Sequence, residues 1–475
     1  MIGIVQAFAP TYARARTQFL EAAATASLPI ESHRHPLLGR DGEDLAMDVV
    51  RDGPPDADKL LIVSSGCHGV EGFCGSGVQV FALHDQEWRD LAHAQGVAVL
   101  YIHALNPYGF SHLRRTTHEN VDLNRNFHDF GQPLPVNAAY REVAPLLLPH
   151  AWPPQADNVQ AVQAYIATHG AAAWQAAITR GQHEFAQGLY FGGTAPTWSN
   201  QTLRAVLRQH GRRASRVGWI DLHTGLGPSG LGERIYCGPD DAAAVQRARH
   251  WWAGDGATPV TSIYDGSSTS AFLTGLMWTA ILDECPQAEF TGIAMEYGTQ
   301  PLQDVLQALR AEHWLYLHPQ APAVQAAQIK AQMLAAFYTD TDAWKGQIIS
   351  QARQSMFQAV QGLNRPSERE YVLRYSAANF CRHRSLPNLS IKDQRHGRPE
   401  RHFRSRCGQF QEPQRASRQR HVAEDLCAVQ AGHGGRQHRK EAQLLRRGGP
   451  RQVGRMGKAQ GHRSGCCQAA VHRPD

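Results

Sequence analysis

Short runs of apolar residues, each followed by a turn signal, recur along the first three quarters of the chain. Runs of six to eight apolar residues without alternation are typical of strands that are buried on both faces. Glycine or Asn-Pro next to such a run marks its end. We predict strands over four segments: 59–65 (KLLIVSS), 97–104 (VAVLYIHA), 217–222 (VGWIDL) and 291–297 (TGIAMEY).

The segments between these strands have the spacing of helices. Apolar residues recur every three to four positions from Glu71 onward, and again over 303–313 and 323–338. Strands that alternate with helices favour an α/β fold, in which ligands bind outside the carboxyl ends of the strands. Four residues with metal-binding or acid–base side chains map there: His68, Glu71, His223 and Glu296.

Charge divides the chain into two unlike pieces. Residues 371–475 contain 22 Lys and Arg against 7 Asp and Glu, whereas residues 1–370 contain 26 against 35. All ten Trp lie at or before Trp344, and five of the nine Cys lie in the last 105 residues. We therefore predict one large domain over residues 1–365 and an Arg-rich tail over residues 366–475.

The tail has no sustained apolar periodicity, so we expect it not to fold. A polybasic arm attracts nucleic acid by its charge, but this tail has few aromatic side chains to stack on bases, which disfavours nucleic acid as a partner. Because 19 of its 22 basic residues are Arg, we also interpret the tail as the product of a GC-rich gene translated out of frame.

The first piece has the features of a cytoplasmic enzyme. No apolar run reaches the ~18 residues that span a bilayer, and no basic segment followed by an apolar one opens the chain, so no membrane partner is expected. Its four cysteines show no CxxC spacing, which argues against a thiolate metal site or a disulfide framework. They are Cys67, Cys74, Cys237 and Cys285.

Two histidines and one carboxylate are the ligands expected of a catalytic zinc ion with an open fourth position. His68, Glu71 and His223 supply that set. His-x-x-Glu alone is weak evidence, because it occurs four times, beginning at His68, His84, His421 and His438. Only His68 follows a buried strand and a glycine, so we favour this match over the other three. On spacing alone, an ordinary hydrogen-bonded histidine near a sheet edge is an open alternative for both His68 and His223.

Other enzyme classes fit the sequence less well. The Gly-x-Ser-x-Gly elbow of a serine hydrolase does not occur. Cys67 as a nucleophile would point away from its neighbour His68 on an extended segment. Residues 225–230 match Gly-x-Gly-x-x-Gly literally, but Pro-Ser-Gly within them is a poor start for a helix. We interpret 225–230 as a flexible loop beside the metal.

Several separated segments resemble, in the right order, the motifs of the zinc carboxypeptidase superfamily. Its first zinc motif is similar to 66–71 (GCHGVE), its Asn-Pro-x-Gly-Phe segment to 106–110, and its Asn-Arg-Asn-aromatic motif to 121–127 (VDLNRNF). The third ligand matches within 221–224 (DLHT), and 263–266 (IYDG) resembles the segment that bears the mobile tyrosine. The resemblance, closest to a bacterial branch, implies a single domain with a mixed sheet of about eight strands between helices.

The resemblance also implies a role for each matched residue. One Zn²⁺ per chain would be held by His68, Glu71 and His223, and it would lower the pKa of bound water to about 7. Glu296 would be the general base. A fixed cation would stabilise the carbonyl oxygen, and the match slightly favours Arg114 over Arg115. The remaining implied roles are substrate carboxylate binding by Asn124 and Arg125, closure by Tyr264, and orientation of a ligand by Asp221.

The implied activity is carboxypeptidase-like hydrolysis of an amide bond next to a free carboxylate. The segment 221–224 looks like the branch of N-acyl-amino-acid deacylases, whereas 106–110 and 121–127 look like the peptidase branch. The expected partner is therefore a small peptide or an N-acyl amino acid. A non-catalytic zinc-binding protein is the second alternative.

Overall fold

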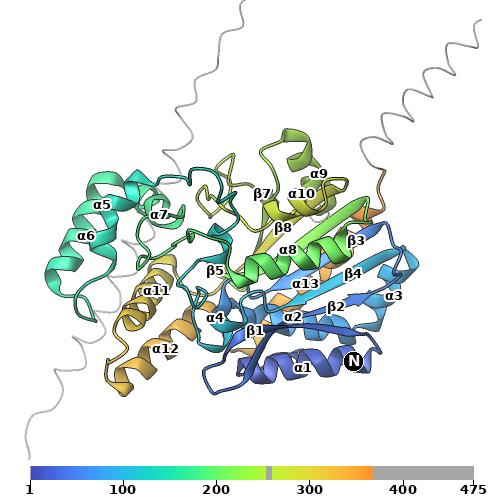
Figure 1. The fold of residues 1–475 in the computed structure, drawn as a ribbon, viewed down its shortest axis with the longest axis horizontal. Helices are drawn as coiled ribbons and strands as arrows, with labels where there is room; N and C mark the ends of the chain where they lie inside the picture. The colour runs from blue at the N-terminus through green and yellow to red at the C-terminus, as the bar shows by residue number, and fades with distance from the viewer. Residues whose placement is uncertain (1, 253–258, 367–475) are drawn as a thin grey trace, which may run out of the picture. The chain divides into compact units, whose positions relative to one another are not determined.

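The fold was analysed in a computed structural model that describes residues 2–252 and 259–366. Its centre is one mixed sheet of eight strands in the order β1-β2-β4-β3-β5-β8-β6-β7. The strands β3, β4, β5 and β8 are parallel, β1 and β2 extend one edge antiparallel, and β6 pairs antiparallel with β8 (Figure 1). The strands are β1 Ile30–Leu38, β2 Asp44–Asp52, β3 Lys59–Ser65, β4 Val97–His103, β5 Arg216–Ser229, β6 Gly232–Cys237, β7 Val260–Thr261 and β8 Glu289–Gly298. This sheet confirms the predicted α/β class with its mixed eight-stranded sheet.

The four strands predicted from the sequence all form, and they are the parallel centre of the sheet. The expected loop at 225–230 is wrong, because β5 continues as far as Ser229. Gly225 and Gly227 have φ of 126° and 90°, and the pairing with β8 shifts register between Thr224 and Ser229. A glycine-rich run therefore forms an irregular strand here, since glycine alone reaches these φ values without strain.

Helices cover both faces of the sheet. Alternate residues of β3 point to opposite faces: Leu61 and Val63 belong to an apolar cluster with residues of α1, α2, α9 and α13, and Leu60 and Ile62 belong to another with residues of α8 and α10. The helices are α1 Tyr12–Thr25, α2 Gly72–His84, α3 Gln86–Ala94, α4 Pro107–Ser111, α5 Ala138–Leu147, α6 Ala156–His169, α7 Ala171–Thr179, α8 Trp198–Gly211, α9 Ala242–Trp252, α10 Thr279–Glu284, α11 Leu302–Leu317, α12 Ala323–Phe337 and α13 Asp342–Leu363.

A separate apolar cluster joins α5, α7, α11 and α12 beside the carboxyl ends of the central strands. It includes Val143, Ile178, Val305 and Phe337, and it reaches Val70 in the turn after β3. The cluster therefore supports the end of the sheet at which the candidate residues gather.

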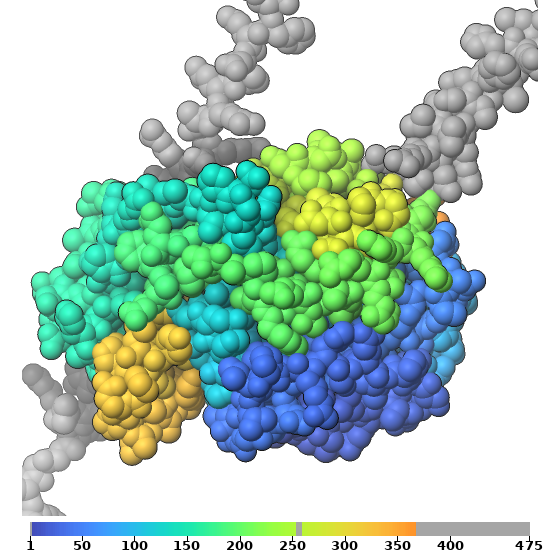
Figure 2. Space-filling view, in the orientation of Figure 1, coloured from blue at the N-terminus to red at the C-terminus, as the bar shows by residue number. Residues whose placement is uncertain are grey.

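In the space-filling view, α8 and the segments after β4 cover the face of the sheet that is turned toward the viewer, and residues of α1 and β1 lie along the lower border (Figure 2).

No described helix combines the length and the apolar character that a membrane crossing requires. The last described helix, α13, ends at Leu363. The predicted tail lies, from residue 367 on, outside the described residues. The predictions that it does not fold and that it is translated out of frame therefore concern residues that the structure does not describe.

One close backbone approach fixes the turn after β3. The 3₁₀ turn η2 (Gly69–Glu71) lies so near α4 that a Cβ added at Gly69 would stand 2.1 Å from the carbonyl carbon of Gly109. Gly346, within α13, has no atom within 4 Å of the same added Cβ. The first glycine is thus required by packing, and the second is not.

We expect Gly69→Ala to lower the free energy of unfolding by about 1–3 kcal/mol, because the backbone of α4 must move. Gly346→Ala, the matched control, should raise it by about 0.5–1 kcal/mol, since alanine favours a helix interior over glycine. Urea unfolding of the full chain measures both. Equal effects of the two substitutions would contradict the assignment of Gly69 as a packing glycine.

Candidate metal centre

Three polar residues meet where two neighbouring parallel strands end. His68 follows β3 and precedes η2, which ends at Glu71. His223 lies on β5, which pairs with β3 through Ser65 and Leu222. The strand pairing therefore brings residues 155 positions apart in the sequence to the same end of the sheet.

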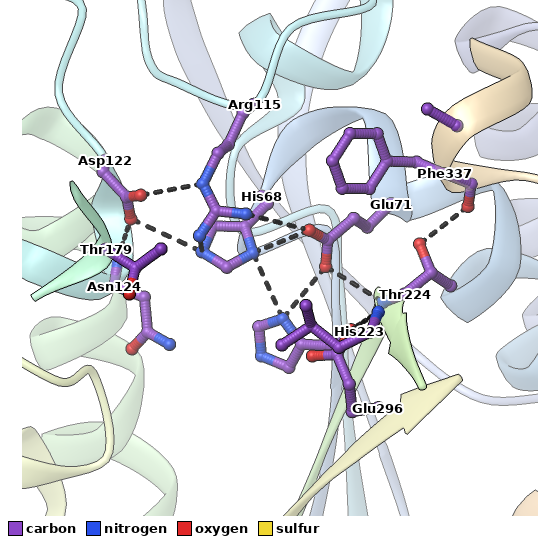
Figure 3. A network of polar contacts seen from close by, with 12 residues as sticks. His68, Glu71, Arg115, Asp122, Asn124, Thr179, His223, Thr224, Glu296 and Phe337 are labelled. Atoms are coloured by element: carbon purple, nitrogen blue, oxygen red, sulfur yellow. Dashed lines mark hydrogen bonds and ion pairs between the residues drawn. The ribbon is translucent and has the colours of Figure 1, made fainter. Parts of the chain in front are cut away.

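The three side chains converge on one point. The Nδ1 atoms of His68 and His223 lie 2.9 and 3.0 Å from the two carboxylate oxygens of Glu71, and 3.3 Å from each other (Figure 3). Ligand atoms at the corners of a tetrahedron, each about 2.0–2.1 Å from zinc, are about 3.3 Å apart. All three residues are buried. Both the donor types and their spacing thus fit a zinc ion held by two histidines and one glutamate.

A second layer of hydrogen bonds orients His223. Its Nε2 lies 2.5 Å from Asp221, whose other oxygen accepts a hydrogen bond from Ser64. A proton on Nε2 makes this bond and leaves Nδ1 available to a metal ion, which is the arrangement that metal-binding histidines use. Burial opposes protonation of His223, but the charges of Asp221 and Glu71 outweigh it and hold its pKa well above the ordinary value.

The Nε2 atom of His68, on the side of the ring away from Glu71, has two partners. It lies 3.4 Å from Asp122 and 2.7 Å from Nη2 of Arg115. An arginine can donate only to an unprotonated Nε2, whereas a carboxylate needs a protonated one, so these contacts belong to alternative protonation states. Binding a metal at Nδ1 favours the proton on Nε2 and the contact with Asp122. Asp122 was not predicted from the sequence, although it stands within the matched 121–127 motif.

Glu296 faces the same space from the adjacent strand. It is paired with His223 in the register of β5 and β8, is 9% exposed, and accepts a hydrogen bond of 3.0 Å from the backbone N–H of Leu226. Burial, together with the nearby charge of Glu71, raises the pKa of Glu296 to about 8. The carboxyl group predicted as a base is therefore placed beside the three converging side chains.

The two adjacent arginines point to different environments. Arg115 contacts Glu71 at 3.3 Å and Asp122 at 2.8 Å, beside the candidate ligands. Arg114 instead donates from Nε to Glu312 on α11 at 2.9 Å and lies over the ring of Tyr316. Arg114, which the sequence slightly favoured as the cation at the reacting carbonyl, is thus held away from the candidate ligands by a buried carboxylate, whereas Arg115 lies beside them.

The guanidinium of Arg125 is engaged by the backbone. It donates from Nε and Nη2 to the carbonyl oxygen of Thr179 at 2.8 and 2.6 Å, and from Nη1 to that of Asn124 at 2.7 Å. Its side chain is only 3% exposed. The expectation of an open fork for a substrate carboxylate is thus not met in this conformation. The amide oxygen of Asn124 accepts from the backbone N–H of Met277 at 2.9 Å.

Two further expectations can be compared with the structure. The hydroxyl of Tyr264 donates to the carbonyl of Gly238 at 2.9 Å, so in this conformation it is held by the protein itself. Burial strongly raises the pKa of Cys67, which keeps this thiol neutral and disfavours it as a nucleophile. Cys67 does form a second candidate metal group with Asp221 and His223, but the latter two are already hydrogen-bonded to each other.

Arg114 belongs to a buried charge cluster that supports the turn of residues 68–71 (the metal turn). Glu312 also accepts from Lys330 on α12 at 2.8 Å. The backbone carbonyls of Arg114 and Arg115 accept hydrogen bonds from Val70 and Gly69, at 2.9 and 3.1 Å. The ion pairs of Glu312 therefore fix the segment of Arg114 and Arg115. The backbone of that segment in turn binds Gly69 and Val70, the residues between His68 and Glu71. Glu312 and Lys330 were missed because nothing in their helical segments distinguishes them from surface charges.

Fold and site define an α/β protein with a buried group of two histidines and one glutamate at the end of a mixed sheet. Residues 8–351 match a family described as "Protein of unknown function (DUF2817)", and the chain belongs to that family. No curated protein matches the chain.

Several solved structures are similar to the chain at low sequence identity. Carboxypeptidase A from Helicoverpa armigera is 14% identical, with 69% of this chain and 73% of that chain covered and a TM-score of 0.37. Bovine thrombin-activatable fibrinolysis inhibitor, solved with tick carboxypeptidase inhibitor, is 10% identical, with 73% of this chain and 97% of that chain covered and a TM-score of 0.35. A metallo-carboxypeptidase from Burkholderia cenocepacia is 13% identical, with 68% of this chain and 67% of that chain covered and a TM-score of 0.31.

We expect Glu312→Gln to lower the free energy of unfolding by about 3–5 kcal/mol, because Arg114 and Lys330 lose their buried counter-charge. Zinc affinity should fall roughly tenfold, as it does when support around a metal ligand is lost. Chelator competition and urea unfolding measure the two effects.

Glu184→Gln is the matched control, since it removes the exposed ion pair of Glu184 with Arg141. Such surface pairs contribute about 0–1 kcal/mol. Unchanged zinc affinity in Glu312→Gln would show that the cluster does not support the metal turn.

Proposed function

We propose that the protein is a zinc-dependent hydrolase that cleaves an amide bond next to a free carboxylate, in a small peptide or an N-acyl amino acid. The convergence of His68, Glu71 and His223 at tetrahedral ligand spacing carries the proposal. The sequence motifs shared with the zinc carboxypeptidase superfamily support the choice of reaction.

The bound metal would supply an acidified water and polarise the substrate carbonyl. Glu296 would take a proton from that water and pass it to the departing amine. Its raised pKa of about 8 reflects burial and the nearby charge of Glu71. A divalent cation nearby favours the charged form, which returns Glu296 to the carboxylate that a base requires.

Arg115 is the candidate to stabilise negative charge on the carbonyl oxygen. Its guanidinium already lies within hydrogen-bond distance of His68 and Glu71. A cation that is held in place before the reaction needs no reorganisation as the charge develops. We therefore assign this role to Arg115, and we assign Arg114 the structural role of anchoring the segment.

Substrate carboxylate recognition is assigned to Asn124 and Arg125. In the conformation described here Arg125 is bonded to Thr179, so this role requires the guanidinium to exchange that backbone carbonyl for the carboxylate. Arginine binds carboxylates with two parallel hydrogen bonds, so the exchange replaces two bonds to a neutral acceptor by two to a charged one. A peptidase and an N-acyl-amino-acid deacylase would use this geometry alike.

The deciding experiment compares the full chain with His68→Ala and Glu296→Gln. We expect one zinc per chain in the wild type, loss of zinc in His68→Ala and full zinc in Glu296→Gln, measured by plasma emission spectroscopy. Hydrolysis of a panel of peptides and N-acyl amino acids should fall at least about a hundredfold in Glu296→Gln, the usual contribution of a general base.

Glu289→Gln, at the start of the same strand, is the control and should keep both zinc and activity. A folded wild-type chain without zinc would refute the proposal. Full zinc with no hydrolysis of any member of the panel would leave the alternative of a non-catalytic zinc-binding protein.

A further inference from the structure

A small cavity lies beside His223, on the face of the sheet that carries Glu296. Asp221 pairs with Ala294 on the neighbouring strand, two positions before the pair of His223 and Glu296. Residues two apart on a strand point to the same face, so the cavity is adjacent to the candidate metal centre. Its volume is about 30 Å³, and its walls include Asn124, Trp219, Asp221, Met277, Trp278 and Ala294.

The cavity offers no free charge to an occupant. The carboxylate of Asp221 is engaged by His223 and Ser64. Cys237 also contributes to the wall, and burial raises the pKa of its thiol far enough to keep it neutral. A charged group placed here would lose its hydration without gaining a partner, which is unfavourable.

The walls of the cavity are held in place. The indole N–H of Trp219 donates to Ser64 at 2.8 Å, and the backbone N–H of Met277 donates to Asn124. The ring of Trp278 lies nearly parallel to that of Phe290, at an angle of 15° with centroids 6.3 Å apart. A cavity of this size holds about one or two water molecules, and its anchored walls restrict an occupant to a group of similar size.

We propose that this cavity receives the side chain of the amino acid that bears the free carboxylate, and that it selects a small, uncharged one: glycine, alanine or serine. This inference rests on the proposed function. Asn124 both lines the cavity and is the candidate to bind the carboxylate, while His223 lines it from the side of the metal. A substrate that spans these two residues places the side chain of its carboxylate-bearing residue at the cavity.

The test uses N-acetyl amino acids and Gly-X dipeptides in which X is Gly, Ala, Ser, Phe or Lys, with the full-length chain loaded with zinc. We expect kcat/KM for X = Ala to exceed that for X = Phe or Lys by tenfold or more, because each methylene group that a site cannot accommodate costs roughly 10–200-fold. Equal kcat/KM for Ala and Phe would overturn the inference while the proposed function stands.

Two variants alter the cavity in opposite directions. Trp278→Ala enlarges it and should reduce the preference for Ala over Phe at least tenfold. Phe272→Ala, in the same segment but 44% exposed and outside the cavity wall, should leave the preference unchanged. Ala294→Val fills the cavity, so hydrolysis at X = Ala should fall while that at X = Gly is retained. A preference that neither Trp278→Ala nor Ala294→Val changes would overturn the inference.

A binding measurement separates failure of this inference from failure of the proposed function. If the wild type hydrolyses nothing, calorimetric titration with N-acetylalanine and N-acetylphenylalanine still examines the cavity. Tighter binding of N-acetylalanine, lost in Ala294→Val, supports the inference. Equal binding of the two ligands overturns it.

Discussion

Buried carboxylates around the candidate metal centre are the constraint on which this part of the structure depends, because a buried charge is tolerated only when it is paired. Glu71 lies between two histidines, Asp122 contacts Arg115, and Glu312 contacts Arg114 and Lys330. Glu296 differs from these, since it accepts its hydrogen bond from a backbone N–H rather than from a cation. Burial and the nearby charge of Glu71 raise its pKa, and a divalent cation held by the neighbouring residues would favour its charged form.

The same pairing explains why helices far away in the sequence belong to the site. Glu312 and Lys330 come from α11 and α12, about 200 residues after the segment they hold. Their charges fix the backbone of residues 112–115, whose carbonyls accept hydrogen bonds from the metal turn. The apolar cluster that packs α11 and α12 against the turn provides the rigidity. Packing of the two helices thereby keeps the candidate ligand atoms in position, which a loop without such support could not do.

The sequence predicted the central strands and singled out the three residues that converge at their ends, because both leave local signals. Apolar runs mark β3, β4, β5 and β8, and strand ends in a parallel sheet meet at one edge whatever the loops do. Arg114 and Arg115 could not be distinguished in this way. Adjacent residues point in different directions, and the choice between them depends on Glu312, which no local pattern links to them. The engagement of Arg125 by Thr179 is likewise a long-range contact. Residues 225–229 were misjudged because glycine indicates a turn more often than an irregular strand.

The segments that would bind the substrate carboxylate and its side chain are mechanically one unit. Asn124 accepts a hydrogen bond from Met277, and Phe127 donates its backbone N–H to Gly275 at 3.1 Å. A Cβ at Gly275 would lie 2.4 Å from the carbonyl oxygen of Arg125, so the two segments are in direct backbone contact. A carboxylate bound at Asn124 and Arg125 would therefore occupy a segment whose backbone contacts the residues that wall the cavity. Under the proposed function, the two segments would together set affinity for the carboxylate and selectivity for side-chain size.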